Sequence, residues 1–305
     1  MLDIEFKENY ELKNITTFKV GGTVKKIFFP KNQSEFLHLL RTEKNYIVLG
    51  SCSNIIFSSN GCDNTIIATT KMNSYEIKGT KITAECGVKG ALLAQKAEEN
   101  GLSGFEFMIG FPGSIGGNIC MNAGAHSQSI SDTLVSACLY DIKKNEILYL
   151  TKEEMKFGYR QSVVQSGQYI CLSAEFELKK ESKERIKETM NRNLEFRKNI
   201  QPPLTNPNAG SVFRNPENDS AGRLLDKAGV KEFDLENVAV WHKHANFIYN
   251  KGNATSTDIL ELMLLMYQKV KDTYTIELMP EIRFIGKKNK REEEICQILY
   301  KKTQK

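Results

Sequence analysis

Two stretches of small residues carry the backbone groups best suited to bind an anion. The first glycine loop, "LGSCSN" (49–54), follows an apolar run, and the second glycine loop, "GFPGSIGGN" (110–118), opens a stretch with five glycines between residues 110 and 125. Glycine lets a ligand approach the main chain closely, and successive exposed N–H groups form anion-binding nests. Neither loop has the lysine of a P-loop. The two could grip a diphosphate with neutral donors, or each could be a plain tight turn.

Three further polar side chains stand in places where they could do chemistry. Arg160 follows Tyr in "FGYRQS", Ser211 follows Gly in "NPNAGSVFRNP", and Glu281 follows Pro in "LMPEIRFIG". Taken alone, such an arginine is usually a surface or ion-pair residue, and such a serine usually shapes a turn or caps a helix. A carboxylate on an apolar strand is costly to bury without a partner, so Glu281 either faces water at a sheet edge or serves a site.

The composition predicts a globular protein of two or three small domains. The chain has 305 residues, 40% of them apolar and 26% charged, and its net charge of +5 comes from scattered Lys and Arg, which predicts no nucleic-acid binding. The charged N-terminus predicts no signal peptide, and no apolar run reaches the ~20 residues of a membrane span. Seven separated cysteines and four histidines predict free thiols, no metal site and a cytoplasmic location.

The hydrophobic pattern predicts a small α/β unit first and a strand-rich part after it. In the first part we expect strands 24–30, 46–50 and 65–70 around a helix over 34–44 that is capped by Ser34. The ligand end of such a unit is the loop after a strand, which is the first glycine loop. In the second part we expect a hairpin over 74–87, helix 89–100, strands 133–142, 146–151 and 169–180, and a polar helix over 182–199.

A proline-rich segment, "QPPLTNPNAG" (201–210), is the best linker candidate. Beyond it we expect helix 220–230, strand 247–250, helix 256–274 capped by Ser256, strand 275–286 and a solvated or docked helix in the tail 287–305. The predicted division is into a first lobe over 1–72, a second lobe over 73–200 and a third domain over 201–305.

Seven segments resemble, in the same order, those of one family of flavin reductases. They are "NITTFKVGG" (14–22), "VLGSCSNIIFS" (48–58), "GFPGSIGGNICMNAGA" (110–125), "FGYRQS" (157–162), "NPNAGSVFRNP" (207–216), "KHANFIYN" (243–250) and "LMPEIRFIG" (278–286). The chain closely resembles the UDP-N-acetylenolpyruvoylglucosamine reductases from about residue 14 to residue 286. The resemblance implies an α+β fold: a two-lobed FAD-binding fold of the vanillyl-alcohol-oxidase type with non-covalent FAD, and a C-terminal α/β substrate-binding domain.

The resemblance also implies which residues hold the cofactor. In the first glycine loop these are Gly50, Ser51, Ser53 and Asn54, and in the second they are Gly113, Ser114, Gly116, Gly117 and Asn118, with bare backbone donors holding the diphosphate. Cys52 stands where family members usually carry glycine. His126 stands where an aromatic residue is common, so it either contacts the flavin or is an ordinary loop histidine.

By the same resemblance, Arg160, Ser211 and Glu281 are catalytic. Arg160 would stabilise the substrate carboxylate as it becomes enolate-like, Ser211 would donate a proton, and Glu281 would polarise Ser211 or stabilise the intermediate. The implied substrate contacts are Tyr159, Arg214, Asn215 and His244.

The reaction implied is a reduction in two halves. NADPH would reduce FAD, and the enolpyruvyl ether of UDP-N-acetylglucosamine enolpyruvate would then take the hydride to give UDP-N-acetylmuramate, a peptidoglycan precursor. No obligate protein partner is inferred, and the short third domain suggests the shorter subtype. Two alternatives stay open: another FAD oxidoreductase of the same cofactor fold, or an inactive regulator that binds a flavin or a nucleotide sugar.

Overall fold

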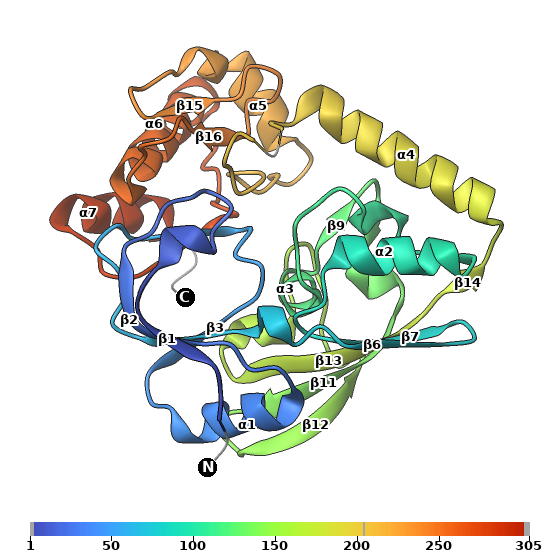
Figure 1. Ribbon diagram of the computed structural model, residues 1–305. Coiled ribbons are helices and arrows are strands. Elements are labelled where there is room, and N and C mark those ends of the chain that lie inside the picture. Colours follow the sequence, from blue (N-terminus) through green and yellow to red (C-terminus); the bar gives the residue numbers. More distant parts are fainter. Residues whose placement is uncertain (1–2, 204, 302–305) are drawn as a thin grey trace. The chain divides into compact units, whose positions relative to one another are not determined.

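The computed structural model describes residues 3–203 and 205–301, which form two compact units that are treated separately (Figure 1). Unit 1 comprises Met1–Lys7, Lys26–Ser51 and Thr65–Arg197, and unit 2 comprises Glu8–Lys25, Cys52–Asn64 and Lys198–Lys305. One boundary between the units lies between Arg197 and Lys198, close to the proline-rich segment, and the others lie within the first 65 residues. The predicted division into segments 1–72, 73–200 and 201–305 stays a prediction.

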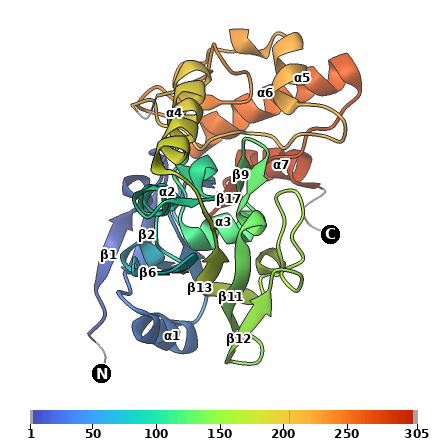
Figure 2. The ribbon, with the colours of Figure 1, turned by 90° about the vertical axis from the view of Figure 1, so that its right-hand side faces the viewer.

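The centre of unit 1 is a five-stranded antiparallel sheet in the order β12-β11-β13-β7-β6. Its strands are β6 (Tyr75–Lys78), β7 (Lys81–Glu85), β11 (Leu134–Asp141), β12 (Glu146–Thr151) and β13 (Tyr169–Glu177). The predicted hairpin at Gly79 is confirmed, because this residue turns between β6 and β7 with φ 64°. Helices α2 (Gly90–Glu99) and α3 (Ile115–Met121) lie on one face of this sheet, and α3 contacts β13 and β7 (Figures 1 and 2).

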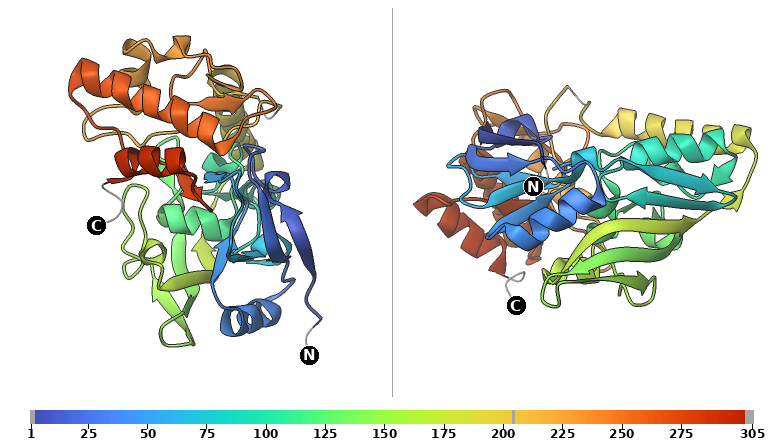
Figure 3. Two further views of the ribbon diagram at one scale, coloured as in Figure 1. Left: turned by 90° about the vertical axis from the view of Figure 1, so that its left-hand side faces the viewer. Right: turned by 60° about the horizontal axis from the view of Figure 1, so that its bottom comes forward.

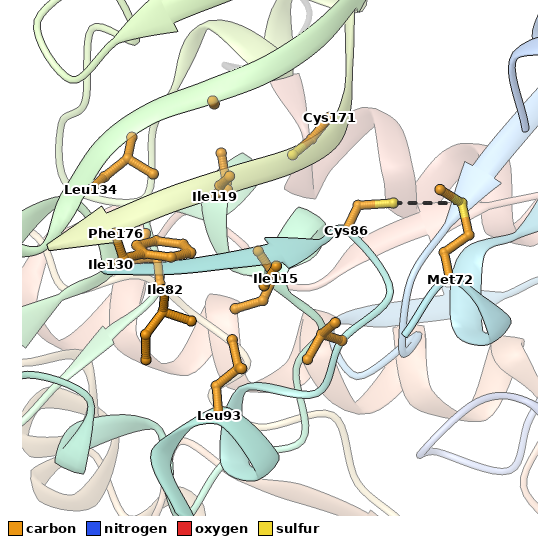
Figure 4. Packing of buried hydrophobic residues seen from close by; sticks show 14 of the residues in the cluster. Met72, Ile82, Cys86, Leu93, Ile115, Ile119, Ile130, Leu134, Cys171 and Phe176 are labelled. Atoms are coloured by element: carbon orange, nitrogen blue, oxygen red, sulfur yellow. Dashed lines mark hydrogen bonds between the residues drawn. The ribbon is translucent and has the colours of Figure 1, made fainter. Parts of the chain in front are cut away.

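The core of unit 1 fixes the start of α3, where the second glycine loop ends. Buried Ile115 of α3 lies near Ile82 of β7 and Leu93 of α2, and buried Ile119 belongs to the same cluster (Figure 4). Burying such aliphatic side chains stabilises the fold by about 1.5–3 kcal/mol each, so the helix and the residue before it are firmly placed.

The α/β part holds strand β3, which leads into the first glycine loop. Strands β2 (Thr23–Phe28), β5 (Thr65–Ala68) and β3 (Tyr46–Leu49) are parallel, in a sheet of order β1-β2-β5-β3 that β1 (Phe6–Glu11) completes. Helix α1 spans Gln33–Thr42. The prediction that Ser34 caps it is wrong: Asn32 is the N-cap and accepts from the Glu35 N–H at 2.9 Å.

Unit 2 contains a short parallel pair and a helical layer. Strand β4 (Ile55–Phe57) pairs with β17 (Arg283–Ile285), and β15 (Val238–Val240) pairs with β16 (Ile248–Asn250). The predicted strand 275–286 is thus regular only over β17. Helix α5 spans Ala221–Lys227.

Two contacting helices, α6 and α7, complete the core of unit 2 (Figure 3, orange and red). Helix α6 spans Ser256–Tyr274 as predicted, but its cap is Thr255 in a capping box with Asp258, and not Ser256. The tail contains α7 (Lys290–Leu299), whose buried Ile295, Cys296 and Leu299 show that it is a docked helix.

The remaining elements are one long helix and several short segments. Helix α4 spans Lys183–Ile200, and the short strands are β8 (Leu102–Ser103), β9 (Gly124–Ala125), β10 (Gln128–Ser129) and β14 (Lys179–Lys180). All seven cysteines carry free thiols, as predicted. Within residues 3–203 and 205–301, no helix combines the length and apolar character that a membrane crossing requires.

Candidate active site

In unit 1, the two glycine loops come together at Gly50 and Ser114. A methyl group on Gly50 would lie 2.1 Å from the Ser114 Oγ, so only glycine allows this approach. The Ser114 Oγ is buried and has no hydrogen-bond partner among the described residues. Leaving a buried hydroxyl unsatisfied costs about 1–3 kcal/mol, and a bound polar ligand would remove that cost. The residues present here therefore fit a cofactor with hydrogen-bonding atoms.

Several backbone N–H groups of the second glycine loop donate to carbonyl groups of the protein itself. The Gly113 N–H donates to Phe111 O (3.1 Å), the Gly116 N–H to Cys86 O (2.8 Å) and the Asn118 N–H to Ser114 O (2.8 Å). The expectation that these three N–H groups are bare donors is therefore not met.

Two of these glycines serve close packing. A methyl group on Gly113 would lie 2.2 Å from the Asn118 Oδ1, and one on Gly116 would lie 2.9 Å from the Cys86 Cβ. Gly117 is different, because it is exposed and a methyl group there would meet only the Ser114 Oγ, at 3.5 Å. The space beside Ser114 and Gly117 is thus the least filled part of the loop.

The first glycine loop turns at Cys52, which has φ 51°. This left-handed conformation explains why glycine suits the position, since a side chain with a Cβ is strained there. The Cys52 side chain is nevertheless buried, and burial raises the pKa of its thiol to about 12. Cys52 is therefore a neutral packing residue at neutral pH.

Arg160 lies at the tip of a tight turn in unit 1. Gly158 and Gln161 exchange two backbone hydrogen bonds of 3.1 Å, which leaves Tyr159 and Arg160 between them. Arg160 has φ 54°, and its carbonyl accepts from the Gln165 Nε2 at 2.8 Å. This strained and anchored backbone is typical of a functional residue.

The guanidinium of Arg160 reaches the end of the glycine-rich stretch. Its Nη2 donates to the Gly124 carbonyl at 3.4 Å, and its Cζ lies 5.2 Å from the centre of the exposed Tyr159 ring. The structure thus brings Arg160 and Tyr159 together and places Arg160 beside residues 110–125.

Sequence reasoning missed a second arginine beside this stretch. Arg197 on α4 fills the space over Gly110, where a methyl group would lie 2.2 Å from the Arg197 Cδ, and its guanidinium lies 6.0 Å from the Phe111 ring centre. Burial lowers its pKa to about 10, so it stays cationic at neutral pH. Its guanidinium has no ion pair or hydrogen bond within the described part of the chain. Nothing local in the sequence distinguishes it from the other arginines.

His126 lies in the same part of unit 1. The centres of its ring and the Phe196 ring lie 5.5 Å apart in a T-shaped arrangement, and burial, together with Arg197 and Arg192, lowers its pKa. His126 therefore packs against α4, and its contact with a flavin stays a prediction.

In unit 2, the predicted reaction residues lie on neighbouring extended segments. The Glu281 N–H donates to Val212 O at 2.8 Å, and Ser211 and Phe247 form an isolated antiparallel bridge. The segment that carries Ser211 therefore lies between the one that carries Glu281 and the one that carries Phe247. Ser211 and Glu281 are both half-buried.

Asn246 clamps this arrangement and was also missed. Its Oδ1 accepts from the Phe213 N–H at 2.9 Å, its Nδ2 donates to Phe213 O at 2.8 Å, and its own carbonyl accepts from the Val212 N–H. The only sequence signal was an amide side chain next to the apolar residues Ala245 and Phe247. Its buried carboxamide replaces ladder hydrogen bonds where the strands are irregular.

Asn54 lies in unit 2 beside Glu281. Its Nδ2 donates to the Glu281 carbonyl at 3.0 Å, and its own carbonyl accepts from the Arg283 N–H at 3.1 Å. The resemblance implied a cofactor contact for Asn54, which stays a prediction, and these two hydrogen bonds join Asn54 to the segment that carries Glu281.

The predicted substrate residues of unit 2 include a donor that has no partner. The Arg214 Nε is buried and unpartnered among the described residues, as is the Nε1 of Trp241, which the sequence did not suggest. Such donors are costly unless a ligand accepts from them. The Oδ1 of Asn215 instead accepts from the Ala221 N–H at 3.0 Å at the start of α5.

His244 is held as a neutral donor. Its Nδ1 accepts from the Asn246 N–H at 3.2 Å, so the neutral ring carries its proton on Nε2. Burial lowers its pKa, which favours this neutral form. Its ring lies close to α5, because a methyl group on Gly222 would be 3.0 Å from the His244 Cε1. Among the described residues, no cluster of three or more His, Cys, Asp or Glu could hold a metal ion.

Comparison with known proteins decides between the families that could use such a site. Residues 201–285 match the family model for the UDP-N-acetylenolpyruvoylglucosamine reductase C-terminal domain, and residues 24–148 match that of the FAD binding domain. The chain is 40% identical over 289 residues to the UDP-N-acetylenolpyruvoylglucosamine reductase of Caldicellulosiruptor bescii, covering 93% of this chain and 91% of that protein. It is 37% identical to the Bacillus pumilus reductase, over 92% of this chain and 94% of that protein.

The chain belongs to the UDP-N-acetylenolpyruvoylglucosamine reductase family. A solved structure agrees: the reductase from Thermus caldophilus has a TM-score of 0.80 and 31% identity, covering 93% of this chain and all of that one. The fold that the resemblance implied, an FAD-binding part followed by a C-terminal domain, is thereby confirmed, as is the class of FAD-dependent oxidoreductase. The individual roles of the site residues remain predictions.

Proposed function

We propose that this chain reduces the enolpyruvyl ether of UDP-N-acetylglucosamine enolpyruvate to UDP-N-acetylmuramate, with bound FAD and with NADPH as the source of electrons. The observation that carries the proposal is that relatives with this reductase name match about 93% of the chain, across both the FAD-binding part and the C-terminal domain. An FAD oxidoreductase of another type would not need the C-terminal domain. We place the reaction in the cytoplasm and assign the chain to the shorter subtype.

Residues of both glycine loops would hold the cofactor. In unit 1, Gly50, Ser51, Ser114 and Gly117 line the approach between the loops, and the unpartnered Ser114 hydroxyl supplies a hydrogen bond. When bound, FAD would supply hydride chemistry, which no amino-acid side chain provides. The glycines exclude side chains from this space, and the closed second loop keeps its shape fixed.

Arg160 stabilises the charge that develops on the substrate carboxylate. A planar guanidinium can donate two parallel hydrogen bonds to a carboxylate, and these strengthen as the carboxylate becomes enolate-like. The turn between Gly158 and Gln161 fixes the arginine backbone, so the side chain needs little reorganisation. Tyr159, exposed beside it, contacts the substrate.

Ser211 donates a proton to the carbon next to the carboxylate. A serine hydroxyl has no pKa near neutrality, so it serves as an acid only when it is held in place next to a strongly basic carbanion. The Asn246 clamp on Val212 and Phe213 supplies that placement. Glu281, whose backbone N–H donates a hydrogen bond to Val212 O, polarises the Ser211 hydroxyl.

The remaining polar groups of unit 2 bind the nucleotide sugar. Arg214 has a buried Nε–H without a partner and a positive charge, which suits a diphosphate. His244 offers a neutral Nε2–H donor, and Trp241 offers an indole N–H. Asn215 shapes the loop before α5 and completes the predicted set.

An anaerobic two-step titration tests the proposal. Protein loaded with FAD is bleached with NADPH, and UDP-N-acetylglucosamine enolpyruvate is then added while the flavin absorbance is followed. We expect bleaching and then recovery, and Ser211→Ala should block recovery but not bleaching. Recovery only with oxygen would indicate an oxidase, and a protein that cannot bind FAD would refute the proposal.

A further inference from the structure

Asn54 lies at the start of β4, where the first glycine loop ends. The resemblance implied that its side chain contacts the cofactor. Its hydrogen bonds to the Glu281 carbonyl and from the Arg283 N–H join it to the segment that carries Glu281, and Asn54 and this segment both belong to unit 2.

Asn54 grips this segment at two points. Its Nδ2 donates to the Glu281 carbonyl at 3.0 Å, and its main-chain carbonyl accepts from the Arg283 N–H at 3.1 Å. The parallel ladder continues from there, with Arg283 opposite Ile55. The other backbone polar group of Glu281, its N–H, donates to Val212 O at 2.8 Å. Both backbone polar groups of Glu281 are therefore held, its carbonyl by Asn54 and its N–H by Val212, the residue next to Ser211.

The local sequence explains why a side chain is needed here. Pro280 precedes Glu281 and has no N–H to give to a ladder, and the regular strand β17 begins only at Arg283. The Glu281 carbonyl thus lies before the regular ladder. The carboxamide of Asn54 supplies the donor that a strand neighbour would otherwise give.

We infer that Asn54 is a positioning residue that fixes the backbone of Glu281 and thereby the direction of its carboxylate toward Ser211. This inference depends on the role proposed for Glu281. Without the Asn54 donor, the peptide between Glu281 and Ile282 can turn, and the carboxylate moves with it. A misplacement of about 1 Å can slow a reaction by about 100-fold.

The test separates the two half-reactions. The variants are Asn54→Ala, Asn54→Asp and Glu281→Gln, made in the full chain and loaded with FAD. We expect Asn54→Ala to slow the recovery of flavin absorbance by about 10- to 100-fold. The dissociation constant of FAD and the rate of bleaching by NADPH should change less than about threefold, because a positioning residue of Glu281 acts on neither. Asn54→Asp keeps the shape but loses the donor, so it should behave in the same way.

Asn60→Ala is the matched control. This asparagine also belongs to the Cys52–Asn64 segment, and its Nδ2 also donates to a backbone carbonyl, that of Lys287, at 3.4 Å. It lies beyond the other end of the β4–β17 pair, so its loss should leave both half-reactions unchanged. Comparable slowing of recovery in Asn60→Ala would show a general loosening of the pair and would overturn the inference.

The double variant Asn54→Ala/Glu281→Gln gives the decisive comparison. If Asn54 acts through Glu281, the double variant recovers no more slowly than Glu281→Gln alone, since the two effects are not additive. Multiplied effects, or a tenfold weaker affinity for FAD in Asn54→Ala, would overturn the inference and make Asn54 a cofactor ligand. Wild-type recovery in Glu281→Gln would instead show that the proposed role of Glu281 is wrong.

Discussion

Replacing Ser114 with alanine should have opposite effects on the FAD-free protein and on FAD binding. The hydroxyl is buried without a partner among the described residues, so its removal relieves an unsatisfied polar group. Because such a group costs about 1–3 kcal/mol, the free energy of unfolding of the FAD-free protein should rise by up to that amount. If the hydroxyl bonds to FAD, the variant also loses a net hydrogen bond of about 0.5–1.5 kcal/mol, which weakens FAD binding about 2- to 13-fold.

The assay pairs urea unfolding of the FAD-free protein with a fluorescence titration of FAD. Ser162→Ala is the matched control, because the Ser162 hydroxyl is also buried in unit 1 but donates to the Cys120 carbonyl at 2.9 Å. That variant should destabilise the protein by about 1 kcal/mol and leave FAD binding unchanged. The reasoning is refuted if Ser114→Ala destabilises the FAD-free protein and binds FAD as tightly as the original protein does.

Three further predictions concern buried ionisable side chains. Glu292 is fully buried and accepts from the hydroxyl of Ser256, so Glu292→Ala should lower the free energy of unfolding in urea by about 2–4 kcal/mol. Glu293 is exposed, so Glu293→Ala should change the same free energy by less than about 0.5 kcal/mol. Burial lowers the pKa of His244 in the folded protein, whereas in the unfolded chain this histidine has its ordinary pKa of about 6.5. The unfolded chain therefore binds more protons, so the free energy of unfolding should fall as the pH drops below about 6.5, and His244→Gln should make this fall less steep in unfolding measurements at several pH values. The Cys52 thiol, with a pKa of about 12, should be thiolate in only about one molecule in ten thousand at pH 8, so iodoacetamide followed by mass spectrometry should label it in urea and not in the native protein.

Helix and strand positions followed from the sequence, but the caps did not. Ser34 and Ser256 both stand near a helix start, yet Asn32 and Thr255 are the caps. Each helix start has two polar residues within three positions, and either of them could be the N-cap. The first helical residue decides which one it is, and packing of the helix determines that residue. The strand predicted over 275–286 shortened to β17 for a similar reason, because Pro280 cannot donate to a ladder.

The proposed reaction residues were assigned because they lie in motifs, whereas the residues that support them lie outside any local pattern. Ser211 and Glu281 were found from the segments around them. Asn246 and Arg197 act through contacts with residues far away in the sequence, at Phe213 and Gly110, and no local pattern reveals such contacts. The glycines of the second loop were predicted as bare donors, although most of them allow close packing. A glycine that binds a ligand through its N–H and a glycine that allows close packing look the same in the sequence. Only the hydrogen-bond partner of each N–H in the structure distinguishes them.

The first glycine loop shows that residue types alone do not reveal which structural partner each residue has. The five residues from Gly50 to Asn54 look like one uniform anion-binding loop, but the chain passes from unit 1 into unit 2 between Ser51 and Cys52. The left-handed turn at Cys52 separates a first half, where Gly50 meets Ser114, from a second half, where Asn54 holds Glu281. Substitutions in the first half should therefore change FAD affinity, and substitution of Asn54 should change the step that uses Glu281. A loop that serves two compact units has to be interpreted residue by residue, because each half has its own structural partners.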